Sequence, residues 1–294
     1  MYTRNGSFLK IVLFIAVIFS ILGCTAGLAI PMNNLSKRIY GGFVVPSSMA
    51  PFVVSLSTQI GKVSGMCGGT IISPRHIVTA AHCVIPPGKN GPTADITIGH
   101  QSTDKDNQAY VHAKKVTLHP RSLVKGSLDM DYDIAVVEVP ELTFDIGTQR
   151  AVIYNKPLVV GQAMLAMGWG KAESESIDRT ELRGLITSVG NCNGGNKSSL
   201  TSDGPVICSL GDNSPGRSIC SGDSGTAIVV NDGGMLKLTA LNSMISLVDS
   251  AVDCGSIQMV SFYLRISYFI DFLVGTTGLS KEYLTGSAST DTIM

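Results

Sequence analysis

The chain has 294 residues, 44% of them hydrophobic and 15% charged, which supplies enough apolar material for a buried core in one large domain or two ordinary ones. Lys plus Arg number 22 and so do Asp plus Glu, so no overall charge bias favours nucleic acid or an anionic membrane as a partner. Partners therefore have to be inferred from local motifs.

Residues 1–29 have the pattern of a secretory signal peptide. Arg4 and Lys10 precede an apolar run over residues 11–22, and small residues follow it. The run is shorter than the roughly 20 residues that a membrane-spanning helix needs. We therefore expect signal removal, secretion to the extracellular space and no stable membrane association. A retained signal anchor and a lipid-processing site at Cys24 are the alternatives.

The segments that follow predict an all-β protein. Short apolar runs rich in β-branched residues recur through both halves of the chain, with turn-forming clusters between them. They lie at residues 52–56, 69–72, 76–79, 96–98, 134–139, 162–170, 182–189, 236–243 and 259–266. Many short strands of this kind favour a barrel or sandwich over a parallel α/β sheet. Residues 267–275 predict a short terminal helix with an aromatic face, and the polar residues from Ser280 onward are expected to fray.

The hexapeptide Cys-Ser-Gly-Asp-Ser-Gly at residues 220–225 is suited to present a nucleophile. The hydroxyl of Ser224 lies between two glycines, which permit a sharp turn and the close approach of a substrate carbonyl. The backbone N–H groups of Gly222 and Ser224 could converge on a developing oxyanion. A serine hydroxyl is a poor nucleophile unless a base takes its proton, so a histidine and a carboxylate are needed upstream.

Two upstream motifs supply these groups. His82, in the segment Thr-Ala-Ala-His-Cys, is the candidate base. Asp133 directly precedes the apolar run 134–137, which would bury its carboxylate behind the histidine. Asp129 and Asp131 lie close by but do not abut that strand, so we predict that they are solvated turn residues.

With these three motifs, in the chain order His, Asp, Ser, the sequence resembles the chymotrypsin-like (trypsin-type) serine endopeptidases. The resemblance covers about residues 39–274. It implies two antiparallel Greek-key β-barrels with a short C-terminal helix. The N-terminal barrel would span residues 39–155 and the C-terminal barrel residues 156–276, with a polar tail over 277–294.

The resemblance also implies the roles of the motif residues. Ser224 would attack the scissile carbonyl, His82 would act as general base and then general acid, and Asp133 would orient the imidazole. The N–H groups of Gly222 and Ser224 would form the oxyanion hole. Thr226 and Ala227 stand where the family usually has Gly-Pro, which concerns the geometry of this loop and not the triad.

A zymogen is implied by the segment that follows the signal. Residues 30–38 would be a propeptide, and cleavage after Arg38 would free the α-amino group of Ile39 to pair with Asp223. A buried ion pair of this kind could hold the oxyanion loop in its working shape. Tyr40 stands where the family usually has valine. The alternative is an exposed basic pair followed by a glycine turn.

Seven cysteines become six if Cys24 leaves with the signal, and an even number in a secreted chain suggests disulfides. Six cysteines allow fifteen pairings, which spacing alone does not resolve. The resemblance implies the pairs Cys67 with Cys83, Cys192 with Cys208, and Cys220 with Cys254.

The substrate pocket differs from that of trypsin-like members. Ser218 occupies the position, six residues before the nucleophile, where such members carry an aspartate. Ser243, Ile245 and Ser261 would complete the pocket. Without a buried anion a P1 Lys or Arg would lose its charge partner, so we expect small or medium apolar P1 residues. Such a pocket would not cleave efficiently after Arg38, which predicts activation by a separate trypsin-like protease.

Protein or peptide substrates, the activating protease and protein protease inhibitors are the partners implied, with no nucleic acid, cofactor or metal. Asp104 and Asp106 could be read as calcium ligands, but a solvated loop is the favoured interpretation. Asn196 begins a glycosylation sequon. The competing function is a catalytically silent homologue that serves as a binding or regulatory module, since a fold can survive loss of its triad.

Overall fold

The structure is a computed structural model, and its described residues are 42–60, 63–86, 89–93, 95–170, 180–191, 203–210, 218–247, 254 and 259–287. Several sequence predictions lie outside these residues. They are the signal peptide, the propeptide, Arg38, Ile39, Cys192 and Asn196.

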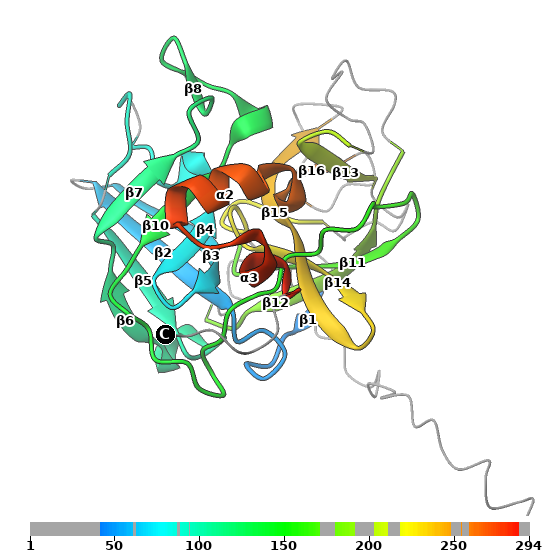
Figure 1. Ribbon diagram of the computed structural model, residues 1–294, viewed down its shortest axis with the longest axis horizontal. Coiled ribbons are helices and arrows are strands. Elements are labelled where there is room, and N and C mark those ends of the chain that lie inside the picture. Colours follow the sequence, from blue (N-terminus) through cyan, green and yellow to red (C-terminus); the bar gives the residue numbers. More distant parts are fainter. Residues whose placement is uncertain are drawn as a thin grey trace, which may run out of the picture. The chain divides into compact units, whose positions relative to one another are not determined.

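One antiparallel sheet is built from the first half of the chain. Its seven strands lie in the spatial order β6-β5-β2-β3-β4-β10-β7. Their bounds are β2 (Val53–Ile60), β3 (Val63–Ser73), β4 (His76–Thr79), β5 (Ile96–His100), β6 (Ala109–His112), β7 (Lys115–Leu118) and β10 (Ala135–Glu138). A separate two-stranded hairpin, β8 (Leu123–Val124) with β9 (Ser127–Leu128), projects at the top of Figure 1.

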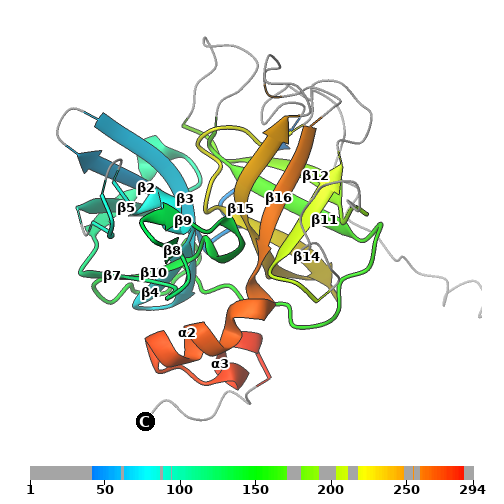
Figure 2. The ribbon, with the colours of Figure 1, turned by 90° about the horizontal axis from the view of Figure 1, so that it is seen from above.

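The second half forms another seven-stranded antiparallel sheet, in the order β1-β12-β11-β14-β15-β16-β13. Its strands are β1 (Phe43–Val44), β11 (Ala163–Gly168), β12 (Arg183–Ser188), β13 (Val206–Leu210), β14 (Ala227–Asp232), β15 (Met235–Leu247) and β16 (Met259–Arg265). The short strand β1, at the start of the described chain, pairs with β12 of this second sheet. The two sheets lie side by side in both views (Figures 1 and 2), so the predicted all-β fold is confirmed.

Alternation along the strands explains where the core lies. On β3, Ile71 packs inside the first sheet, while the next residue, Ile72, joins a cluster that contains residues of both halves. On β11, Ala166 packs inside the second sheet and Met167 joins the same shared cluster. Successive side chains of a strand point to opposite faces, so each of these strands contributes to two clusters at once. The shared cluster holds the sheets against each other and fixes the loops at their junction.

The predicted terminal helix is present and carries its aromatic face against the first half. Helix α2 (Ile270–Thr277) follows β16 through a 3-10 turn. The ring of Phe272 lies 4.9 Å from that of His119, and the ring of Phe269 lies 6.0 Å from that of Tyr132. Since Tyr132 is the residue before Asp133, the C-terminal segment buttresses the loop that carries the candidate acid.

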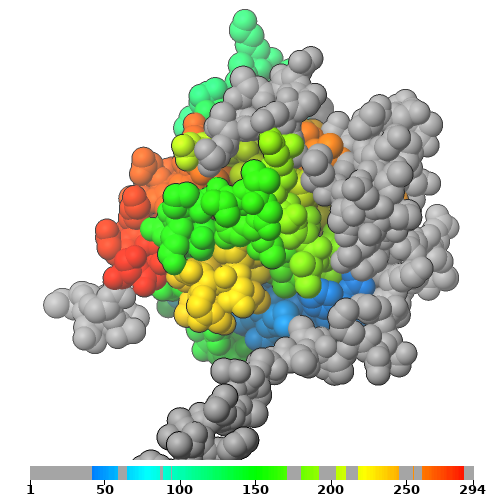
Figure 3. All heavy atoms as spheres, turned by 90° about the vertical axis from the view of Figure 1, so that its right-hand side faces the viewer, coloured from blue at the N-terminus to red at the C-terminus, as the bar shows by residue number. Residues whose placement is uncertain are grey.

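The expected fraying from Ser280 onward is wrong for residues 280–287. Ser280 caps a further helix, α3 (Lys281–Thr285), by accepting a hydrogen bond from the N–H of Tyr283. Leu284 is buried, and its carbonyl accepts a hydrogen bond of 2.9 Å from the N–H of Ile153 in the connection between the sheets. Figure 3 shows this connection in green, beside the C-terminal helices in orange and red and above the β14–β15 hairpin in yellow.

Candidate active site

The register of β4 and β10 brings His82 beside Asp133. Thr79, the last residue of β4, pairs with Ala135, the first residue of β10. The strands are antiparallel, so the residues just after β4 and just before β10 meet at one edge of the sheet. His82 lies in a 3-10 turn there (Ala81–Cys83), and the Cys67–Cys83 disulfide ties this turn to β3.

Asp133 is fully buried and accepts three hydrogen bonds. The backbone N–H of His82 donates to Oδ1 over 2.8 Å. Oδ2 lies 2.8 Å from Nδ1 of His82, and it also accepts a hydrogen bond of 2.8 Å from the hydroxyl of Ser243. A buried carboxylate is tolerated only when it is paired and hydrogen-bonded, and here both oxygens are engaged.

The pKa of the His82 imidazole is raised above its ordinary value of 6.5, as the net result of two opposed effects. Burial of the ring lowers the pKa, but the hydrogen bond and the negative charge of Asp133 outweigh burial. Because Nδ1 faces a carboxylate, the neutral ring carries its proton on Nδ1 and leaves Nε2 as the basic nitrogen. His82 is therefore suited to accept a proton through Nε2.

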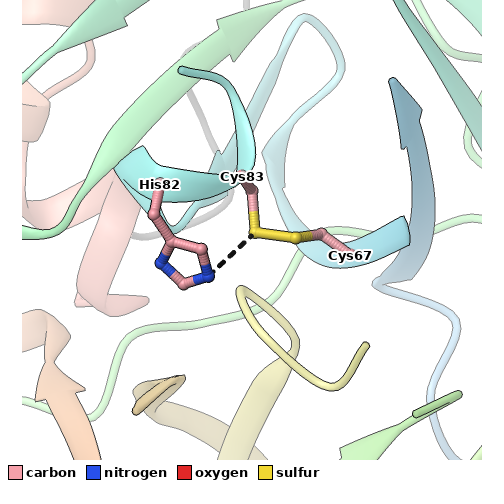
Figure 4. A group of neighbouring side chains, drawn as sticks. All are labelled: Cys67, His82 and Cys83. Carbon is pink, nitrogen blue, oxygen red and sulfur yellow. Dashed lines mark hydrogen bonds between the residues drawn. A yellow bond between two sulfur atoms is a disulfide. The ribbon is translucent and has the colours of Figure 1, made fainter. Parts of the chain in front are cut away.

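The basic nitrogen lies close to the Cys67–Cys83 disulfide, with Nε2 of His82 3.7 Å from Sγ of Cys83 (Figure 4). The three side chains bring their ligand-type atoms within 4.8 Å of one another. The two sulfurs are bonded to each other, so they are not thiolates and do not offer a metal the ligands it needs. The group is a disulfide beside a histidine and not a metal site.

The loop of Ser224 packs against the segment that leads to His82. The N–H of Gly68 on β3 donates to the carbonyl of Ser224 over 2.8 Å. Gly225 has a φ of +77°, and a Cβ added there would lie 3.1 Å from the backbone nitrogen of Ala80 and still closer to the side chain of Thr79. Only glycine fits this close approach. Ser224 is partly exposed, and its hydroxyl makes no hydrogen bond to any of the residues that the structure describes.

Two backbone donors of this turn are available. Gly222 has a φ of +98°, and the N–H of Asp223 turns back to donate to the carbonyl of Cys220. Within the described part of the chain, the N–H groups of Gly222 and Ser224 donate to no acceptor. Two such donors on either side of Asp223 could serve one external oxygen. The Cys220–Cys254 disulfide braces the start of the turn.

Asp223 is fully buried between the turn and the end of β11. The N–H of Cys220 donates to its Oδ2 and the N–H of Gly170 to its Oδ1, both over 2.7 Å. Burial in this position raises the pKa of the Asp223 carboxyl from 3.8 to about 7, against the opposing effect of these two hydrogen bonds. Among the described residues no basic side chain forms an ion pair with it.

Three of the four predicted pocket residues are buried serines. Ser218 and Ser261 are buried, and Ser261 lies opposite Ile245 in the register of β16 and β15. The hydroxyl of Ser261 also hydrogen-bonds Tyr263, a fully buried residue of the same strand. Ser243 contacts the candidate acid, as described above. The side chain of Ile245 lies outside the described part of the structure.

Two other sequence predictions can be compared with the structure. The carboxylate of Asp104 accepts hydrogen bonds from the N–H of Asp106 and the side-chain amide of Asn107, a local cap of a 3-10 turn. Cys208 is disulfide-bonded, but its predicted partner lies outside the described residues.

Sequence reasoning placed Ser243 in the substrate pocket but missed its hydrogen bond to Asp133, which joins residues 110 positions apart. It also missed Asn242, the neighbouring residue on β15, which is fully buried. The available signal was a pair of polar residues, Asn242-Ser243, that interrupts the apolar run of β15.

Comparison with known proteins decides the family. The trypsin family matches residues 39–273. The chain belongs to the trypsin family. Trypsin 5G1 of Aedes aegypti is 28% identical over 270 residues, which cover 88% of this chain and 94% of that protein. Chymotrypsin of Phaedon cochleariae is 30% identical over 204 residues, 66% and 69% of the two chains. Chymotrypsin-like elastase family member 1 of Bos taurus is 24% identical over 247 residues, 81% and 89%.

The trypsin family consists of serine proteases that act on proteins, and its members are typically secreted and made as zymogens. The family predicted from the three motifs is therefore confirmed. Among the described residues of this trypsin-family chain, no helix is both long and apolar enough to cross a membrane.

Proposed function

We propose that this trypsin-family protein is an active, secreted serine endopeptidase in which Ser224, His82 and Asp133 form the catalytic triad. The observation that carries the proposal is the bond of 2.8 Å between Nδ1 of His82 and the fully buried Asp133. This bond orients the imidazole and stabilises its protonated form, which is what a general base needs during catalysis.

The reaction follows from the groups at the site. Nε2 of His82 takes the proton of the Ser224 hydroxyl as the oxygen attacks the scissile carbonyl carbon. The carbonyl oxygen becomes an oxyanion, which the N–H groups of Gly222 and Ser224 stabilise. His82 then gives its proton to the leaving amine, and an acyl-enzyme forms on Ser224. Water, deprotonated by His82, hydrolyses this ester and restores the serine.

Covalent labelling tests the proposal. Protein cut after Arg38 by an added trypsin-like protease should react with a fluorophosphonate, and the Ser224→Ala variant should not. Uncut protein incubated alone should keep its N-terminus and label weakly. Correctly cut, folded protein that takes no label would indicate the silent homologue instead. An Ile39 terminus that appears without added protease would overturn activation by a separate enzyme.

Activation would act on the turn through Asp223. Buried and without an ion pair to a basic side chain of the described residues, Asp223 is suited to receive the α-amino group of Ile39 after the cut. Strand β1 starts four residues beyond Ile39, at Phe43, and pairs with β12, which is the neighbour of β11. Since Gly168 and Gly170 at the end of β11 pack against the Asp223 carboxylate, the new terminus would enter near its partner.

The P1 preference is proposed from the neutral pocket. Ser218 brings no charge to the base of the pocket, and a P1 Lys or Arg would be buried without a partner. Small or medium apolar P1 residues should dominate the products of a mixed peptide library. Ser218→Asp should add cleavage after Lys and Arg. A strong wild-type preference for Lys or Arg would contradict this pocket assignment.

A further inference from the structure

A β-bulge in β15 directs two neighbouring polar side chains to different parts of the site. The register between β15 and β16 shifts between Asn242 and Met244, which makes Ser243 the extra residue. Bulges of this kind re-aim side chains beside active sites. The hydroxyl of Ser243 reaches Asp133, whereas Asn242 extends into the second sheet.

The side chain of Asn242 connects β15 to the end of β11. It is fully buried, and its amide Nδ2 donates a hydrogen bond of 2.8 Å to the carbonyl of Met167. Strand β14 separates these two strands and pairs with β11 only at Leu165 and Ala166. The Asn242 amide therefore bonds to β11 at Met167, one residue beyond the last β11–β14 pair at Ala166.

The backbone of Asn242 holds the residues that follow the nucleophile. Its carbonyl accepts a hydrogen bond of 2.7 Å from the N–H of Gly225, and its N–H donates to the carbonyl of Thr226 over 3.0 Å. These two bonds fix the C-terminal end of the turn that contains Ser224.

Met167 leads directly to the support of the other end of that turn. A Cβ added at Gly170 would lie 2.6 Å from the carboxyl carbon of Asp223, and the N–H of Gly170 donates to the same carboxylate. A shift of residues 167–170 would therefore shift Asp223. Asn242 is bonded to both supports of the nucleophile turn, through its side chain on one side and its backbone on the other.

We propose that Asn242 is a positioning residue that sets the two ends of the nucleophile turn relative to each other, and with them the Gly222 and Ser224 N–H donors. The inference rests on the proposed protease function. Oδ1 of Asn242 has no hydrogen-bond partner among the described residues, and an apolar side chain would avoid that buried acceptor. An amide at this position is therefore less favourable for stability than an apolar side chain, and its Nδ2 donor is the group that contributes to the site.

The test compares Asn242→Leu, which keeps the branched shape but removes the donor, with Thr239→Val as the matched control. Thr239 lies on the same strand, is buried, and has a hydroxyl with no partner among the described residues. Each activated variant is titrated with an ester that releases one chromophore per acylated site, and kcat and KM are then measured per titrated site. We expect kcat of Asn242→Leu to fall about 10- to 100-fold with KM unchanged. Thr239→Val should match the wild type.

Other outcomes overturn the inference in separate ways. If the titrated fraction falls but kcat per site is unchanged, Asn242 serves stability only. If Asn242→Leu and a second variant, Asn242→Ala, both fail to fold while Thr239→Val folds, the residue is needed for folding and positioning is rejected. A wild-type protein that gives no burst at all would show that the protease function itself is wrong.

Discussion

Replacing Asp133 with asparagine is expected to lower kcat of the activated protein by about 10⁴-fold, the size found when this carboxylate is lost from a Ser-His-Asp triad. The substituted amide can still accept the hydrogen bond from the backbone N–H of His82. Its NH₂ group would face Nδ1 of His82 and force that nitrogen to become an acceptor. The ring proton then moves to Nε2, the nitrogen that takes the proton of Ser224 in the proposed mechanism.

The measurement is steady-state hydrolysis of a peptide ester, with thermal unfolding to confirm that the fold is retained. Asp129→Asn is the matched control, because Asp129 caps a 3-10 turn four residues away and asparagine preserves the capping oxygen. The activity of Asp129→Asn should remain within about twofold of the wild type, because the substitution keeps the cap and changes no buried contact. Equal losses in both variants would indicate that Asp133 is not the orienting acid.

The uncleaved protein is expected to lose stability as pH rises through the range from about 4 to about 7. The pKa of Asp223 is about 7 in the folded chain against 3.8 for an ordinary carboxyl, because burial disfavours its charge. The folded state therefore holds this proton more tightly than the unfolded state, and the difference of about three pKa units corresponds to on the order of 4 kcal/mol. The penalty is absent below pH 4 and complete above pH 7.

Urea unfolding of the uncleaved Ser224→Ala protein, at pH 4.5 and 7.5, measures this effect without self-digestion. A second protein that also carries Asp223→Asn isolates the contribution of Asp223, because the other titrating groups are shared. Cleavage after Arg38 should remove the penalty at pH 7.5, since under the proposed activation the new amino group would stabilise the ionised carboxylate. If Asp223→Asn leaves the pH dependence of the free energy of unfolding unchanged, the raised pKa of the buried Asp223 carboxyl is contradicted.

Local patterns predicted the strands that have a regular apolar face. The run at 76–79 corresponds to β4 (His76–Thr79), in which Ile77, Val78 and Thr79 are buried. Strand β3 begins six residues before its predicted start at residue 69. Its first four residues, Val-Ser-Gly-Met, lack a regular apolar pattern and are held by pairing with β2, for example Gly65 with Thr58. Cross-strand pairing of this kind leaves no periodic signal.

Long-range polar contacts were beyond sequence reasoning for the same reason. The motifs identified His82 and Asp133 separately, and the structure joins them. No property of Ser243 or Asn242 within the apolar run of β15 shows that one bonds to Asp133 and the other to Met167. Their partners lie on other strands, and only the fold determines which ones.

Helix α3 also escaped prediction, because its composition is polar and its docking depends on a few residues such as Leu284. It lies beyond residue 273, where the match to the trypsin family ends. A recombinant version trimmed at that family boundary would expose the apolar surface that Leu284 covers and leave the Ile153 amide open to water. A recombinant protein should therefore include α3 and should not end at residue 273, the last residue that matches the trypsin family.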